Sequence, residues 1–268
     1  MTERLDILTN PHSDRVKNVA GLSRRSARHR HRQFLVEGPQ AVRELVAHAP
    51  SLVRDVYITE AMAGRERATV NRARSAGLFV HPVTPEVAEA LSPDAQGILA
   101  VAALPSPGSL EALAGARLVV VLPRVADPGN AGTLIRIADA AGADVVVVCA
   151  GGVEVTNPKV VRASAGSLFH LPVVTGVPFD AVARGARRAG LRLLGADAAG
   201  AVDVFAADAA LTDPTAWVFG NEAQGLSAAE RAACDRTVSV PIFGRAESLN
   251  VAAAAAVCLY ESARAQRR

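Results

Sequence analysis

The pattern of hydrophobic and polar positions divides the chain near residue 105. Up to that point, short apolar stretches alternate with segments whose apolar residues recur at helical spacing, which is typical of a small α/β unit. The predicted strands cover residues 33–38, 53–59, 78–84 and 97–105, and the predicted helices cover 39–49, 70–77 and 85–92. Pro39 suits the first turn of the first of these helices.

From residue 117 onward the predicted strands are continuously apolar rather than alternating. They cover residues 117–122, 144–149, 171–175, 191–196, 215–220 and 236–242, and helical spacing is found at 132–142, 180–190 and 251–265. Strands that are apolar on both faces are typical of a parallel sheet covered by helices on both sides. A ligand of such a sheet is expected at the carboxyl ends of the strands.

The stretch PSPGSLEALAGA at residues 105–116 carries two prolines and two glycines, which favour a connection that leaves room for one short helix. We therefore expect two domains, at 1–105 and 117–268, joined by a linker at 106–116. No apolar run approaches the roughly 20 residues needed to span a bilayer, and the N-terminal MTERLDILTNPHSDR has charges where a signal peptide would be apolar, so we expect a cytoplasmic protein.

Charge is unevenly distributed between the two parts. Residues 1–105 hold 14 of the 29 basic and 11 of the 26 acidic residues, which leaves 15 of each for the remainder and places the whole excess of +3 in the first part. Residues 15–32 carry seven basic residues, two histidines and no acid. This segment is either a solvated basic helix face or a surface that neutralises phosphates, and its candidate contacts with nucleic acid are Arg24, Arg25, Arg28 and Arg30.

Three loops combine glycine with polar side chains, and each follows a predicted strand of the second part. They are RVADPGNAGTLIR at 124–136, GNEAQGLS at 220–227 and IFGRAESLN at 242–250. The first loop has neither the GxGxxG of a dinucleotide site nor the GxxxxGK[ST] of a phosphate loop. The sequence therefore favours a ligand site at the strand ends but no familiar nucleotide fold.

Each candidate residue in these loops has a structural alternative. Arg136 offers a guanidinium for a phosphate or carboxylate, or it caps a neighbouring strand or pairs with Asp139. Ser227 is a good N-cap with a glutamate three residues on, which leaves Glu222 for another task. Ser248 and Asn250 both precede the last predicted helix, so one of them caps it and the other needs another explanation.

These loops closely resemble the motifs of the SpoU (TrmH) family of RNA ribose 2′-O-methyltransferases, in the SPOUT superfamily. The likeness rests on DPGNAGTLIRIADAAGAD, VFGNEAQGLS and VPIFGRAESLNVAAAAAV in that order, on NPKVVRASAGSLFHLPV between them, and on FLVEGPQAVREL near the start. The resemblance implies an α/β fold with a C-terminal SPOUT domain, whose parallel sheet ends in a deep trefoil knot, after a smaller L30e-like α/β domain that binds RNA. It also implies a homodimer.

The resemblance further implies S-adenosylmethionine as cofactor, held around Gly220, Ile242 and Leu249. Arg136 would activate the ribose hydroxyl, with Asn130, Glu222, Ser248 and Asn250 completing the catalytic set. Because a guanidinium cannot readily lose its proton, Arg136 acts either as that base or as a clamp on the adjacent phosphate that stabilises the developing alkoxide. No metal is expected in this chemistry, and the sequence shows no cluster of His or Cys that would hold one.

The RNA contacts implied by the resemblance include Arg162, which alternatively braces a loop. The layout favours 23S ribosomal RNA as the substrate. Transfer RNA, or a non-catalytic RNA-binding or ribosome-assembly role that keeps the fold, is the alternative. Cys149, Cys234 and Cys258 are far apart and outside any CxxC pattern, so we expect buried thiols and neither a disulfide framework nor a zinc site.

Overall fold

The computed structural model describes residues 6–267, which form two compact units. Among these residues the first unit consists of 6–106 and 156–170, and the second consists of 107–155 and 171–267. The segment 156–170 follows the first strands of the second unit in the sequence but packs with the first unit, a placement that the predicted boundary at 117 did not include.

The first unit is built on a four-stranded mixed sheet. Its strands are β1 (Gln33–Glu37), β2 (Val53–Thr59), β3 (Phe79–Val83) and β4 (Ile98–Ala103), in the order β1-β4-β2-β3. β4 pairs antiparallel with both β1 and β2, whereas β2 and β3 are parallel. All four strands lie where the hydrophobic pattern predicts them, which confirms a small α/β unit.

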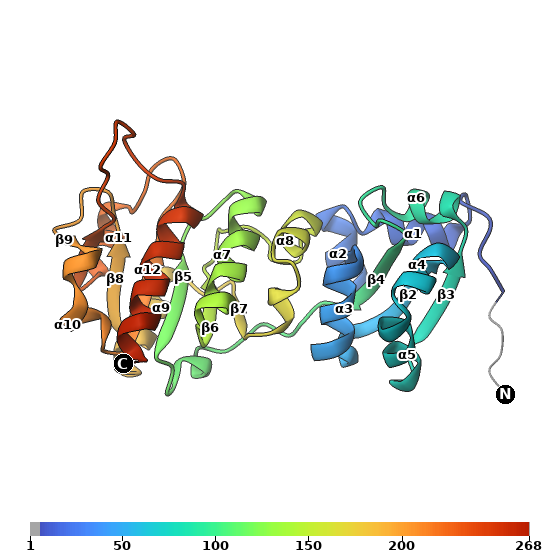
Figure 1. Ribbon diagram of the computed structural model, residues 1–268, viewed down its shortest axis with the longest axis horizontal. Helices are drawn as coiled ribbons and strands as arrows, with labels where there is room; N and C mark the ends of the chain where they lie inside the picture. The colour runs from blue at the N-terminus through green and yellow to red at the C-terminus, as the bar shows by residue number, and fades with distance from the viewer. Residues whose placement is uncertain (1–5, 268) are drawn as a thin grey trace. The chain divides into compact units, whose positions relative to one another are not determined.

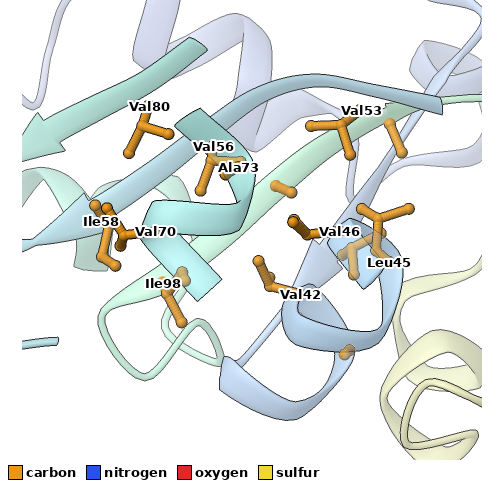
Figure 2. Packing of buried hydrophobic residues seen from close by; sticks show 14 of the residues in the cluster. Val42, Leu45, Val46, Val53, Val56, Ile58, Val70, Ala73, Val80 and Ile98 are labelled. Atoms are coloured by element: carbon orange, nitrogen blue, oxygen red, sulfur yellow. The ribbon is translucent and has the colours of Figure 1, made fainter. Parts of the chain in front are cut away.

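Helices cover both faces of this sheet. α3 (Pro39–His48) and α5 (Arg67–Ser75) pack on one face through residues such as Val42, Leu45 and Val70, as Figure 2 shows. α1 (Asp14–Gly21) and α6 (Pro85–Leu91) pack on the other face, because successive side chains of a strand point to opposite sides. The remaining elements of this unit are α2 (Arg25–His31), η1 (Pro50–Leu52), α4 (Glu60–Arg65), α8 (Pro158–Ala163) and η3 (Ser167–Phe169).

The second unit contains a seven-stranded sheet in which every pair of neighbours is parallel. The order is β7-β6-β5-β10-β8-β11-β9. The strands are β5 (Leu118–Leu122), β6 (Val145–Val148), β7 (Val173–Thr175), β8 (Arg192–Ala196), β9 (Val202–Asp203), β10 (Thr215–Phe219) and β11 (Arg236–Ser239). The parallel sheet confirms the prediction. β9, with two residues, is too short for a hydrophobic pattern to reveal.

Helices also cover both faces of the second sheet. α9 (Phe179–Arg188) and η2 (Leu110–Leu113) pack on the face that carries Val119 and Val218. α12 (Val251–Gln266) lies beside α7 (Pro128–Ala141) (Figure 1) and packs against β10. The indole of Trp217 donates to the hydroxyl of Ser262 at 2.8 Å, so α12 is joined to the centre of the sheet by a buried hydrogen bond. The remaining helices of this unit are η4 (Val204–Ala206), α10 (Asp208–Leu211) and α11 (Ala228–Ala233).

Three other features bear on the sequence predictions. The linker holds the short helix that the sequence allowed, η2, and Leu113 of this helix is buried in the core of the second unit. Cys149 and Cys258 are buried as expected, whereas Cys234 is only partly buried, and burial raises the pKa of the first two thiols to about 12 and that of Cys234 to about 11. None of the helices described in residues 6–267 is long and apolar enough to cross a membrane.

Candidate active site

The candidate site lies at the carboxyl ends of the strands in the second unit. The loops that follow β5, β8, β10 and β11 meet there, because parallel strands end at the same edge of a sheet. The loops after β8, β10 and β11 line a cavity of about 310 Å³, within the range of small-molecule sites. Its lining includes five predicted site residues: Gly220, Glu222, Ile242, Ser248 and Leu249.

Gly220 is required at the end of β10 by the close approach of two backbone segments. A Cβ atom at this position would lie 2.3 Å from the carbonyl carbon of Gly225 and 2.5 Å from the nitrogen of Leu226. Asn221 and Gly225 close the loop with reciprocal backbone hydrogen bonds of 3.0 and 2.8 Å. A side chain on Gly220 would therefore force the loop open and change one wall of the cavity.

Glu222 connects the loop after β10 to the loop after β5. Its carboxylate accepts hydrogen bonds from the backbone nitrogens of Ala126 at 3.3 Å and Asp127 at 3.0 Å, and from the Asn130 amide at 3.4 Å. The cap of the following helix is formed instead by Ser227 and Glu230, which make the predicted capping box. Glu222 therefore does not cap α11. It instead fixes the start of α7.

Asn250 has two roles. Its side-chain oxygen accepts from the Ala252 nitrogen at 2.8 Å and caps α12, while its amide donates to the side-chain oxygen of Asn130 at 3.2 Å. Asn130 therefore bridges Glu222 and Asn250, and the three motifs meet in one chain of hydrogen bonds. Asn250 is therefore the residue that caps α12. Ser248 is exposed and lines the cavity, where it offers a hydroxyl group.

Arg136 is exposed on α7 and lies outside this chain of hydrogen bonds. The residues around it on the helix, Leu134, Ile135 and Ala138, are buried, so the packing of α7 fixes the backbone that carries the guanidinium. Arg136 is presented to solvent and is the one basic side chain among the predicted catalytic residues.

Arg124 is a site residue that the sequence reasoning did not single out. Its guanidinium donates to both carboxylate oxygens of the buried Glu230, at 2.7 and 3.0 Å, and to Gln224 and the Gly225 carbonyl at 3.1 Å each. Burial alone would raise the pKa of Glu230, but the hydrogen bonds from Arg124 and Ser227 outweigh it and hold this pKa below its ordinary value. Arg124 thereby ties the loop at 220–226 to α11.

Comparison with known proteins identifies the arrangement. Residues 117–260 match the SpoU rRNA Methylase family, and residues 13–100 match the MRM3-like substrate binding domain. The chain belongs to the SpoU rRNA methylase family. This confirms the resemblance seen in the three loop motifs.

Several SpoU relatives are similar over most of the chain. The 23S rRNA (guanosine-2′-O-)-methyltransferase RlmB of Bordetella pertussis is 32% identical over 238 residues, covering 86% of this chain and 96% of the relative. The 23S rRNA (guanosine(2553)-2′-O)-methyltransferase RlmP of Bacillus subtilis is 31% identical, covering 92% and 95%. The crystal structure of the SpoU methyltransferase AviRb from Streptomyces viridochromogenes in complex with AdoMet has a TM-score of 0.82 at 35% identity, covering 94% and 98%.

The basic segment of this SpoU protein lies within the match to the substrate binding domain and is not uniform. Arg24, Arg25 and Arg30 are exposed, on or next to α2. Arg28 is only 2% exposed, and its guanidinium donates to the carbonyl oxygens of Leu22 at 3.1 Å and Ser23 at 2.7 Å. The expectation that Arg28 contacts RNA is therefore corrected: Arg28 holds the turn between α1 and α2.

Arg162 is placed in the first unit as a bracing residue. It forms ion pairs with Glu37, which is buried at the end of β1, and with Asp94 at 2.9 Å. Ser92 donates to the other oxygen of Glu37 at 2.5 Å. The arrangement favours the loop-bracing interpretation of Arg162 over RNA contact, because its charge is used to compensate a buried carboxylate.

The structure also brings together a cluster that the sequence did not reveal. Glu44, His48 and His170 hold their ligand atoms within 4.8 Å of one another. The sequence analysis saw no histidine cluster, and this expectation was wrong. His170 is remote in sequence from Glu44 and His48, which lie four residues apart on α3.

Proposed function

We propose that this SpoU protein transfers a methyl group from S-adenosylmethionine to a ribose 2′-hydroxyl of 23S ribosomal RNA. The observation that carries the proposal is the chain of hydrogen bonds from Glu222 through Asn130 to Asn250 beside the cavity. The relatives named above are 23S rRNA 2′-O-methyltransferases, and AviRb was crystallised with AdoMet, which supports both the reaction and the cofactor. The rRNA substrates of these relatives also support a cytoplasmic location.

The cavity suits a cofactor of nucleoside size. Its volume is about 310 Å³, its wall at Gly220 is bare backbone, and Ile242 and Leu249 offer apolar surface. Backbone groups of the loops would hold the polar edges of the cofactor, and the two apolar side chains would cover its flat face. Bound S-adenosylmethionine supplies a methyl carbon that is already activated for displacement.

The residues of the chain contribute mainly by positioning. Glu222 fixes Asn130, and Asn130 fixes Asn250, so the polar groups beside the cavity are oriented before RNA arrives. Arg136, exposed on α7, holds the phosphate next to the reactive ribose and stabilises the negative charge that develops on the 2′-oxygen. A guanidinium is suited to this role because it keeps its proton.

The docking of RNA is assigned to the first unit. Arg24, Arg25 and Arg30 are exposed in a segment without acidic residues, within the match to a substrate binding domain. Such cations neutralise phosphates and release counterions, which steers a folded RNA to the protein without reading its sequence.

We further assign a homodimer to this protein. Phe243 is 91% exposed and Tyr260 is 54% exposed, while Ile242 and Leu249 are also partly open to solvent. Exposed large apolar side chains on this loop and on α12 are typical of an interface. A second copy would cover them and complete the wall of the cavity beside Ile242 and Leu249.

The proposed function is tested by separating cofactor binding from turnover in Arg136→Ala. Removing one donor to a developing oxyanion costs about a hundredfold or more in rate, so methyl transfer should fall by at least that factor. The affinity for S-adenosylmethionine, measured by calorimetry, should be unchanged, because Arg136 does not line the cavity. Unchanged turnover would remove Arg136 from the mechanism. Cofactor and RNA binding without transfer by the wild type would indicate an assembly factor instead.

A further inference from the structure

Glu44, His48 and His170 form a compact cluster in the first unit, whereas the proposed active site belongs to the second unit. Glu44 and His48 are one turn apart on α3, and His170 follows η3 at the end of the segment 156–170. The Nε2 atoms of His48 and His170 lie 3.5 and 3.3 Å from the same atom, Oε2 of Glu44. Both imidazoles therefore converge on one carboxylate oxygen.

These separations match those expected between ligands of one metal ion, although the contact of 3.3 Å between His170 and Glu44 is also within hydrogen-bond distance. A tetrahedral Zn²⁺ ion with bonds of about 2.0–2.2 Å places neighbouring ligand atoms roughly 3.3–3.6 Å apart. A charge-assisted N–H···O hydrogen bond is shorter, about 2.7–2.9 Å. The same chain provides the comparison, because His81 Nε2 lies 2.6 Å from Asp55 Oδ1 in a pair that is an ordinary hydrogen bond.

The surroundings of Glu44 hold its carboxylate toward the two imidazoles. Gln40 donates to the other oxygen, Oε1, at 2.8 Å, which leaves Oε2 to face the histidines. Gly166, with φ of +100°, lets the Glu44 side chain pass, because a Cβ atom there would lie 2.3 Å from Glu44 Cγ. A carboxylate fixed by a hydrogen bond of this kind is typical of metal sites, where partners of the ligands orient them.

We propose that Glu44, His48 and His170 bind one divalent transition-metal ion, with Zn²⁺ as the preferred ion. Two imidazole nitrogens and one carboxylate oxygen are ligands that suit Zn²⁺, and water completes the coordination. His48 and His170 are exposed, so the ion enters from solvent. The ligands come from α3 and from the end of the segment 156–170. The ion therefore links that segment to α3 and stabilises the first unit.

The test uses the full chain after removal of metal with a chelator. Titration with ZnCl₂ should show saturable binding of one ion, and Co²⁺ in its place should give the visible absorption bands of a tetrahedral site. His170→Asn and His48→Asn should each weaken Zn²⁺ binding by at least about tenfold, since even loss of a residue that only orients a ligand costs this much. His12→Asn changes an exposed histidine outside the cluster and should bind Zn²⁺ like the wild type.

Thermal unfolding provides the second readout. Zn²⁺ should raise the Tm of the wild type and of His12→Asn but not that of the double variant His48→Asn/His170→Asn, because an ion stabilises only a protein that binds it in the folded state. Circular dichroism without metal verifies that the double variant is folded. The proposal is overturned if the wild type shows no saturable binding, or if the double variant binds Zn²⁺ as tightly as the wild type. Neither outcome depends on methyl transfer.

Discussion

At the residue scale, the buried carboxylate of Glu37 shows what compensates charge in the first unit. Its partners are Arg162 and the Ser92 hydroxyl, and its side chain is 4% exposed. If its cation is removed, a buried carboxylate either stays charged without compensation or takes up a proton. Either outcome destabilises the folded state.

Arg162→Met should therefore lower the free energy of unfolding, by at most about 3 kcal/mol because the guanidinium is partly open to solvent. Urea denaturation of the single and double variants with Glu37→Gln measures the coupling. The double variant should be more stable than the sum of the single changes predicts. If the losses of unfolding free energy are additive and Arg162→Met binds RNA more weakly, Arg162 would instead be an RNA contact.

The pair of Arg124 and Glu230 predicts a dependence of stability on pH. The pKa of Glu230 is lower in the folded protein than its ordinary value, so its contribution is fully present above the unfolded pKa of about 4.3 and is lost as pH falls through the lower folded pKa. Arg124→Met removes the main cause of the lowering, so its unfolding free energy should fall less steeply below pH 5 than that of the wild type. Arg72→Met, an exposed arginine on α5, is the matched control and should keep the wild-type slope.

Local contacts at this scale could be predicted from the sequence, and distant ones could not. The capping box of Ser227 and Glu230 and the cap by Asn250 depend on residues two or three positions apart, which a motif describes. The contact of Arg124 with Glu230 and the cluster at His170 depend on how strands and helices pack. Arg124 directly follows β5 and one proline, and this position at a strand end was the available signal.

At the scale of elements, the basic segment contains both a scaffold residue and exposed cations. Replacing Arg24, Arg25 and Arg30 with alanine should weaken RNA binding and flatten its dependence on salt, because each lost phosphate contact removes about 0.7–0.9 from the slope of log K against log salt. S-adenosylmethionine affinity should not change. The measurement is a filter-binding titration at several salt concentrations.

The control for this experiment removes the same charge from α5 of the same unit. Arg67, Arg72 and Arg74 are exposed there, and their replacement by alanine should leave the salt slope unchanged. An equal loss in both triple variants would show that only net charge matters and would contradict a specific role for the segment at α2.

The elements of the second sheet were predicted well because strands buried on both faces give long apolar runs. β9 was missed because a strand of two residues is too short to show a hydrophobic pattern. The order and direction of the strands in the first sheet depend on pairing between distant residues, and so does the packing of the segment 156–170 with the first unit.

At the scale of the whole molecule, the exposed apolar residues predict self-association. Sedimentation velocity should show a dimer for the wild type and a larger monomer fraction for Phe243→Ser, because Phe243 leaves its apolar surface to water in the monomer. Phe79→Ser, on β3 of the first unit, removes a 64% exposed phenylalanine and should not change the dimer. A monomer for the wild type at micromolar concentration would contradict the homodimer.

The central claim is methyl transfer to a ribose of 23S rRNA, and the most direct measurement locates the methyl group. Large-subunit RNA that lacks native modification is incubated with labelled S-adenosylmethionine and the protein, then digested with alkali. The account predicts one labelled alkali-resistant dinucleotide with the wild type and none with Arg136→Ala. Label released from the base, label in transfer RNA alone, or no label from a protein that binds the cofactor and the RNA would contradict it.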